Sequence, residues 1–334
     1  MNGPPYQTID DVINSPKKRG MYFEDEEAAK RLLEFVGAWR LRPYWHPFES
    51  KKSRAYPRKF IEGTTFERVR AVYEFDRELK LAVFAAVERV EVAMRAIWAR
   101  AMYRELGPGG YAVASLYASV KEHRSRRRRL RRLWNKAKQE EPMKKYDGQY
   151  GPLSVPPVHY AVEMMSFGEL VRWMNGLDTG GRRKETLKYQ DEIRRIASDF
   201  RRQFALPYPY VVSSGRHLRH VRNLAAHHAR MWDRAISCCM LATPRKSRPC
   251  LRESMDVTAL ADTPRDLERA RQGIYRSLTL LAYLSDRFSD QCQFRQRMLK
   301  LMKKHDPPLR RMAFPEDWRE RPVWKRDATC KRQA

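Results

Sequence analysis

Cysteine is scarce in this chain, and its distribution excludes two common uses of the residue. The 334 residues include five cysteines, two of them adjacent and none in a CxxC pair: Cys238, Cys239, Cys250, Cys292 and Cys330. An odd number without paired spacing fits neither a disulfide framework nor a zinc finger. We therefore expect reduced thiols, as in a cytoplasmic protein.

Long apolar runs are absent as well. No uninterrupted stretch approaches the roughly 20 residues of a membrane span, and residues 1–11 are polar and lack the apolar core of a signal peptide. The sequence also offers no convincing alternating strand pattern, no Gly-rich phosphate loop and no GxSxG or Cys-His catalytic arrangement. We expect no membrane insertion and no β-sheet.

Acidic residues are few relative to basic ones. The chain has 68 Lys and Arg against 40 Asp and Glu, a formal net charge of +28 and a pI of about 10.2. Hydrophobic residues make up 42% of the chain, which excludes a wholly disordered protein. A balance this basic indicates a polyanionic partner, and without a membrane segment we expect nucleic acid.

Helical periodicity dominates what remains, so the predicted fold class is all-α. Helices are expected at residues 26–36, 65–104, 111–138, 158–177 (loosened near 166–168), 183–204, 267–288 and 293–304, with Gly- and Pro-rich breaks between several of them. We divide the chain into an N-terminal helical element (1–62), a helical core (63–290) and a C-terminal helix with a basic tail (291–334).

One further helix, capped by Ser213 or Ser214 and running to about residue 240, carries the densest polar chemistry. On a helical wheel its apolar face holds Leu218, Val221, Ala225, Trp232, Ile236 and Cys239, and its polar face holds Arg216, Arg219, His220, Asn223, His227 and Arg230. His228 falls beside the apolar face, which predicts a packed, hydrogen-bonded side chain. His227 points away from it, and Arg216, Arg219 and Arg230 on the polar face are expected to contact RNA.

Arg222, Asn223 and His227 suit phosphodiester cleavage without a metal. Histidine can give or take a proton near neutral pH, arginine can bind a phosphate through two hydrogen bonds, and asparagine can orient a hydroxyl. RNA would supply its own 2′-hydroxyl as the nucleophile. A surface histidine is often without function, however, and Arg222 lies about 140° from His227 on the wheel. A two-fold dimer through the polar face of this helix would bring in a second copy of the motif.

The motif also carries a resemblance. Arg222-Asn223-x3-His227 resembles the R-x4-6-H signature of the HEPN superfamily, and residues 222–234 are similar to its Abi-like (abortive infection) family. Over residues 15–325, the segments that resemble the family in order are 19–20 with 33–48, 63–66 with 73–79, 166–170, and 314–318 with Trp324. The resemblance implies an all-α, HEPN-like bundle and a metal-independent, toxin-like endoribonuclease of phage defence. It further implies catalytic Arg222 and His227 at a homodimer interface and association with small non-coding RNA.

Arginine clusters offer candidate RNA contacts outside the motif. Residues 123–134 contain seven arginines on a predicted helix without acidic compensation, and we expect the RNA backbone to contact Arg126, Arg127, Arg128, Arg129, Arg131 and Arg132. The alternative is that these arginines form a solvated helix face without a ligand. A weaker patch comprises Lys300, Lys303, Lys304, Arg310 and Arg311.

Two further sets of polar residues could have either a functional or a purely structural role. Glu88, Glu91 and Arg95 share one helix face, where a Glu91–Arg95 ion pair is slightly favoured over support for Arg222 or His227. His217 and His220 lack the carboxylate or thiol partners of a zinc site, so we expect no metal and no cofactor. Trp39, Tyr44 and Trp45 are expected in the core.

The first functional hypothesis is therefore an endoribonuclease in which Asn223 and His228 support Arg222 and His227. The second is an RNA-binding or RNA-scaffolding protein that does not cleave, and a weaker third is a DNA-binding protein. Cleavage of RNA in EDTA that leaves 2′,3′-cyclic ends would support only the first.

Overall fold

The computed structural model describes residues 7–52, 57–137, 155–237, 241–242, 249–288 and 293–325. Over these ranges the chain is helical, and its only extended pairings are isolated β-bridges, so the all-α prediction is confirmed. The α-helices are α1 (Ile9–Lys18), α2 (Glu26–Val36), α3 (Ala38–Trp45), α4 (Phe66–Leu106), α5 (Val120–Ala137), α7 (Val158–Met164), α8 (Phe167–Gly176), α9 (Lys184–Leu187), α10 (Gln190–Phe204), α11 (Tyr208–Ala226), α12 (Pro249–Ser254), α13 (Pro264–Arg271), α14 (Ile274–Phe288), α15 (Phe294–His305) and α16 (Pro322–Lys325). Short 3-10 turns connect several of them: η1 (His46–Phe48), η2 (Gly110–Ala112), η3 (Ala114–Leu116), η4 (Thr258–Leu260) and η5 (Leu309–Met312).

Helix α4 is the axis of the molecule. It has 41 residues, which corresponds to roughly 60 Å at 1.5 Å per residue. Thr65 caps its start by accepting a hydrogen bond from the N–H of Arg68, and Gly107, at φ 75°, ends it. Buried side chains recur along it from Phe66 to Met102. Because different partners cover different sides of α4, its apolar residues do not keep to a single face.

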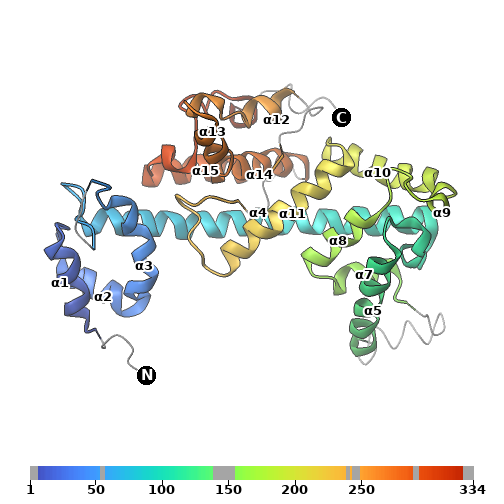
Figure 1. Cartoon of the computed structure of the whole chain (residues 1–334), viewed down its shortest axis with the longest axis horizontal. Helices are drawn as coiled ribbons and strands as arrows, with labels where there is room; N and C mark the ends of the chain where they lie inside the picture. Colours follow the sequence, from blue (N-terminus) through green and yellow to red (C-terminus); the bar gives the residue numbers. More distant parts are fainter. Residues whose placement is uncertain are drawn as a thin grey trace.

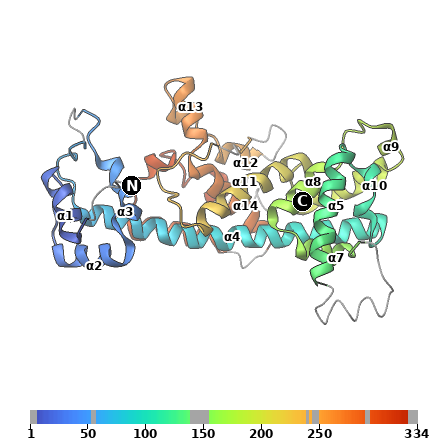
Figure 2. The same ribbon diagram turned by 60° about the horizontal axis from the view of Figure 1, so that its bottom comes forward.

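The other helices surround α4 in groups (Figures 1 and 2). Helices α1–α3 lie at the N-terminal end of α4, α5 and α7–α10 gather around its other end, and α12–α15 lie along one side of its middle. Helix α11 crosses α4 between the last two groups, and α4 packs against α3, α7, α10, α11, α14 and α15. The C-terminal end of α11 therefore lies near the middle of the axis.

Most predicted helices are confirmed, several of them in two pieces. Ser166 separates α7 from α8 with a capping box to Glu169, near the expected loosening. Gln272 and Gly273 similarly separate α13 from α14. The break between α9 and α10 is one that the sequence pattern did not indicate. Helices α1, α3, α12 and α16 were not expected, although Thr8 and Asp11 form a capping box at α1. The helix expected from residue 111 begins only at Val120, after η2 and η3.

The predicted start of α11 was wrong. The helix begins at Tyr208, with Pro209 in its first turn, so that Ser213 and Ser214 lie inside it instead of capping it. Proline is tolerated in the first turn of a helix because the N–H groups there have no intrahelical acceptor. Pro207 and Pro209, which form one of the Pro-rich breaks expected between helices, are therefore the beginning of the next helix.

The core is one continuous set of buried side chains contributed by helices from all parts of the chain. Tyr44 and Trp45 belong to it as expected, but Trp39 is 79% exposed, so its core assignment was wrong. Helix α3 turns Trp39 outward, where the Arg42 guanidinium lies 5.2 Å from its ring centre. The division at residues 62 and 290 stays a prediction.

Candidate active site

The motif block straddles the end of α11 instead of lying inside one helix. His227 is the C-cap, and His228 follows in the left-handed region at φ 56°. The N–H of His228 donates to the Ala225 carbonyl (3.1 Å) and the N–H of Ala229 to the Leu224 carbonyl (2.9 Å). These two bonds form a Schellman motif, the usual way to reverse a chain after a helix.

The predicted continuation of this helix to about residue 240 was therefore wrong. A Schellman turn normally places glycine at the left-handed position, which here holds His228 at a cost of roughly 1 kcal/mol, so the sequence carried no stop signal. The packed setting predicted for His228 was wrong for the same reason. Its side chain is exposed, and its backbone carbonyl accepts a hydrogen bond from Arg40 Nη1 (2.9 Å).

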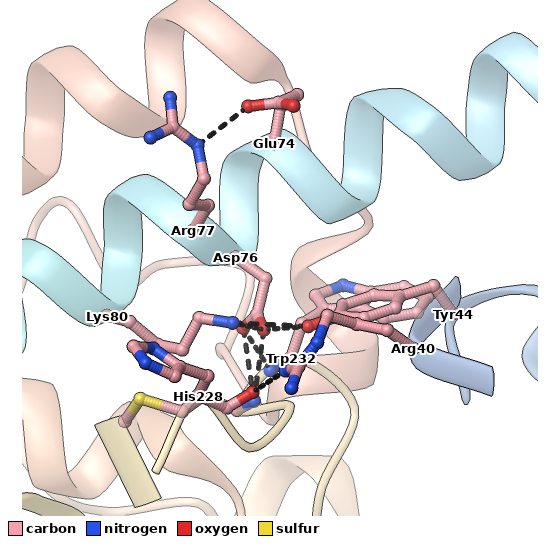
Figure 3. Close-up of polar contacts among 9 residues, drawn as sticks. Arg40, Tyr44, Glu74, Asp76, Arg77, Lys80, His228 and Trp232 are labelled. Atoms are coloured by element: carbon pink, nitrogen blue, oxygen red, sulfur yellow. Dashed lines mark hydrogen bonds and ion pairs between the residues drawn. The ribbon is translucent and has the colours of Figure 1, made fainter. Parts of the chain in front are cut away.

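Asp76 of α4 fixes the chain after the turn (Figure 3). Its fully buried carboxylate accepts hydrogen bonds from the backbone N–H groups of Trp232 (2.7 Å) and Met231 (3.1 Å) and from the Tyr44 hydroxyl (2.6 Å), and Lys80 Nζ lies 3.2 Å away. Burial, with the nearby carboxylate, raises the pKa of Tyr44 well above its usual value, so the hydroxyl stays a donor. Asp76 thus ties α3, α4 and the motif loop together.

Arg230 is a second tether. Its guanidinium donates to the carbonyls of Pro43 and Asp233, the latter at 3.1 Å, and burial lowers its pKa. Arg311 adds an ion pair to Asp233 (3.3 Å) and a hydrogen bond to the Pro47 carbonyl (2.8 Å). These contacts favour a structural role for Arg230, although the sequence had suggested RNA contact.

Arg222 forms an ion pair with Glu91 of α4. Its Nη2 lies 3.4 Å from Glu91 Oε2, and its side chain is 29% exposed. Glu91 also pairs with Arg95, which in turn donates to the Val162 carbonyl. The expected Glu91–Arg95 pair is confirmed, and the same carboxylate supports Arg222, the alternative that the sequence disfavoured. Glu88 is exposed and takes no part.

His227 and Asn223 add polar groups to the end of α11. His227 is exposed, Asn223 is partly exposed, and neither side chain has a hydrogen-bond partner within the part of the chain that the structure describes. This end of α11 therefore offers one arginine held by a carboxylate, one amide and the exposed imidazoles of His227 and His228. That set can bind a phosphate, orient a hydroxyl and transfer a proton.

The other arginines of α11 have different environments. Arg216 is exposed, whereas Arg219 is partly buried over Gly168, where an added Cβ would lie 2.9 Å from Arg219 Cδ. This contact explains the glycine in the segment 166–170. Arg216 remains accessible to RNA, and Arg219 is accessible only in part.

The arginine run forms α5, which lies toward the far end of α4 from the N-terminal helices, away from the motif end of α11 (Figure 1). Arg126 pairs with Glu122 and Arg129 with Glu169, so two of the six candidates face acidic partners. The other four are exposed and have no partner among the described residues: Arg127, Arg128, Arg131 and Arg132.

The remaining polar groups bear on no metal site in the described ranges. His217 is buried with its Nε2 2.7 Å from Ser277 Oγ, and burial lowers the pKa of His220. Across those residues, no three His, Cys, Asp or Glu side chains come together as ligands of one ion. Cys250 is a buried thiol, and the other cysteines lie outside the described residues.

An apolar stripe on α4 runs alongside the site. Leu81, Phe84 and Val92 are 56%, 42% and 52% exposed, and their spacing places them on one face, which also carries the exposed Glu88 and has Glu91 at its edge. None of the described helices is both long and apolar enough to cross a membrane. An exposed apolar face of this kind typically marks an interaction surface.

Comparison with known proteins identifies the family. The family described as Abi-like protein matches residues 31–233, more than half of the chain, from within α2 to the end of the Asp76-bound loop. No curated protein and no solved structure matches the chain. The matched range includes Asp76, Glu91, Arg222 and His227, and the chain belongs to the Abi-like protein family.

Proposed function

We propose that this protein is an abortive-infection endoribonuclease, a phage-defence protein that cleaves RNA at a site shared by two copies of the chain. The observation that carries the proposal is the end of α11, where Glu91 pairs with Arg222 and His227, five residues later, is exposed and has no hydrogen-bond partner among the described residues. Family membership supports the defence role, and the net charge of +28 supports an RNA substrate.

The chemistry requires no group other than these side chains and the RNA. His227 of one copy would take the proton of the 2′-hydroxyl, whose oxygen attacks the adjacent phosphorus. Arg222 would stabilise the charge that develops on the phosphoryl oxygens. A second imidazole would protonate the departing 5′-oxygen. The products are a 2′,3′-cyclic phosphate and a free 5′-hydroxyl.

In-line cleavage benefits from an acid and a base on opposite sides of the phosphorus, so we assign the second imidazole to His227 of a second copy of the chain. The sequence suggested that the polar face of α11 forms the dimer contact. The apolar stripe of Leu81, Phe84 and Val92 supplies the adjoining apolar area, because it borders Glu91. Both faces would be covered in one two-fold interface.

The first experiment incubates purified protein with RNA in EDTA and identifies the product ends. Wild type and the control Arg201→Ala, which changes an exposed arginine of α10, should give 2′,3′-cyclic ends. The double variant Arg222→Ala/His227→Ala should give none. Equal cleavage by the double variant would remove these residues from the mechanism.

The second experiment tests the dimer by sedimentation. Leu81→Glu should convert the dimer to a monomer and abolish cleavage, whereas Leu187→Glu should leave both unchanged. Leu187 is the matched control because it is 58% exposed, close to the 56% of Leu81, and lies on α9. A wild-type monomer that cleaves RNA would refute the shared site.

The alternative is an RNA-binding protein that does not cleave. The four unpartnered arginines of α5 favour it, because they can hold RNA at a distance from the motif. In that case RNA would bind to wild type and remain intact, and charge reversal on α5 would weaken the binding.

A further inference from the structure

A groove of about 580 Å³ lies between α4 and α15, outside the candidate active site. Apolar side chains line part of it: Ala82, Ala85, Ala86, Phe294 and Leu301. The residues from α15 lie beyond the range that matches the Abi-like family. The size is within the range of small-molecule pockets.

The groove is rich in cations. Arg89 of α4 and Arg297, Lys300 and Lys304 of α15 line it, against the single acid Glu78. Glu78 is occupied, since Lys304 Nζ lies 2.6 Å and His305 Nε2 3.1 Å from its carboxylate, and the contact with Lys304 lowers the pKa of Glu78. The other three cations have no partner among the described residues.

The beginning of α15 adds to this positive potential. Gln293, its N-cap, and Gln296 line the groove, and the Gln293 side chain makes no capping hydrogen bond. An uncapped helix N-terminus attracts anions. The two amides can also donate to and accept from the edge of a planar base.

We propose that this groove binds a nucleotide, with its phosphate against Arg89, Arg297 and Lys300 and its base over the alanine and leucine surface. A small anion alone would leave the apolar lining of the groove exposed to water, and an apolar ligand would leave its three cations without an anionic partner. A free nucleotide and one unit of an RNA strand share this chemistry, so either can supply it.

The groove is separate from the cleavage site. Arg89 and Glu91 are two residues apart on α4, which places them about 160° apart around the helix. The exposed face of Leu81 lies between them. Loss of binding in the groove and loss of cleavage at Arg222 and His227 are therefore distinguishable, and the double variant of those two residues should bind ADP as wild type does.

The test measures binding of two probes to the full chain: ADP by calorimetry, and a short fluorescent 2′-O-methyl oligoribonucleotide, which 2′-hydroxyl attack cannot cleave. Lys300→Glu should weaken binding about tenfold, the loss expected for one charge-assisted hydrogen bond. The control Lys303→Glu has the same charge change on the same helix, and Lys303 is exposed like Lys300 but does not line the groove. It should weaken binding less than about twofold.

Selective weakening of ADP binding by Lys300→Glu supports a free nucleotide as the ligand. Selective weakening with the oligonucleotide alone supports a unit of an RNA strand. Equal effects of the two substitutions would show diffuse attraction to a basic surface and overturn the proposal. Binding of neither probe would overturn it as well. Circular dichroism of both variants confirms that they are folded.

Discussion

Asp76→Ala should be among the most destabilising single substitutions in this chain. The change removes a fully buried carboxylate that accepts hydrogen bonds from Met231, Trp232 and Tyr44 and pairs with Lys80. Removing one member of a buried ion pair costs about 3–5 kcal/mol, and each buried donor left without an acceptor costs about 1–3 kcal/mol. These costs overlap because water can enter the space, so we expect a total loss of about 4 kcal/mol.

Urea unfolding followed by circular dichroism measures this loss, with Glu74→Ala as the matched control. Glu74 lies two residues earlier on α4 and pairs with Arg77 at the surface (2.9 Å; Figure 3). Such an exposed pair contributes about 0.5 kcal/mol. The contrast between the two variants therefore isolates the contribution of burial on one helix.

A double variant tests the cause. Adding Lys80→Met to Asp76→Ala removes the orphaned charge and should restore about 2 kcal/mol, a coupling of the size seen between contacting residues. A loss below about 1 kcal/mol for Asp76→Ala, or simple additivity with Lys80→Met, would refute the view that Asp76 anchors the loop.

The remaining predictions concern the site, the turn and acid stability. Glu91→Gln should lower RNA cleavage about tenfold by loosening Arg222, whereas Glu88→Gln, exposed on the same helix, should change the rate less than about twofold; equal rates would remove Glu91 from the site. His228→Gly should raise the free energy of unfolding by about 0.5 kcal/mol, because glycine accepts the left-handed conformation without strain, and a loss in urea unfolding would contradict this. Burial lowers the pKa of His123 from 6.5 to about 4. Burying the neutral imidazole therefore contributes fully to the free energy of unfolding only above pH 6.5. This contribution, about 3 kcal/mol at most, is lost as the pH falls toward 4. His123→Phe should flatten that part of the stability profile, and an unchanged pH slope would show that another group is responsible.

The helices could be predicted from the sequence because their apolar spacing is a local property. The long helix α4 shows this, since its cap Thr65 and its terminating Gly107 are both visible in the sequence. Helices α9 and α10 form one continuous amphipathic pattern in the sequence, and the break between them depends on contacts with distant parts of the chain. The position of α11 was misjudged because proline both ends and begins helices.

The candidate site could be predicted only in part. Arg222, Asn223 and His227 were found because they are close in sequence and chemically distinctive. Glu91 was found as a member of an ion pair, but its contact with Arg222 joins residues 131 positions apart. The role of Asp76 could not be inferred, because an aspartate in the middle of a helix gives no sign of accepting backbone N–H groups from another segment.

The turn at His228 explains why the resemblance to the Abi-like family extends over a block of thirteen residues and is not confined to Arg222 and His227. In a continuing helix the side chains three and four positions after His227 would flank its imidazole. The Schellman turn instead directs residues 230–232 to Pro43 and Asp76, so no following helical turn covers His227. Most of the block thus builds the reversal that leaves His227 exposed, and Asp76, which lies outside the block, holds the chain after the reversal. The exposed His227 and the buried Asp76 are therefore two parts of one structural requirement.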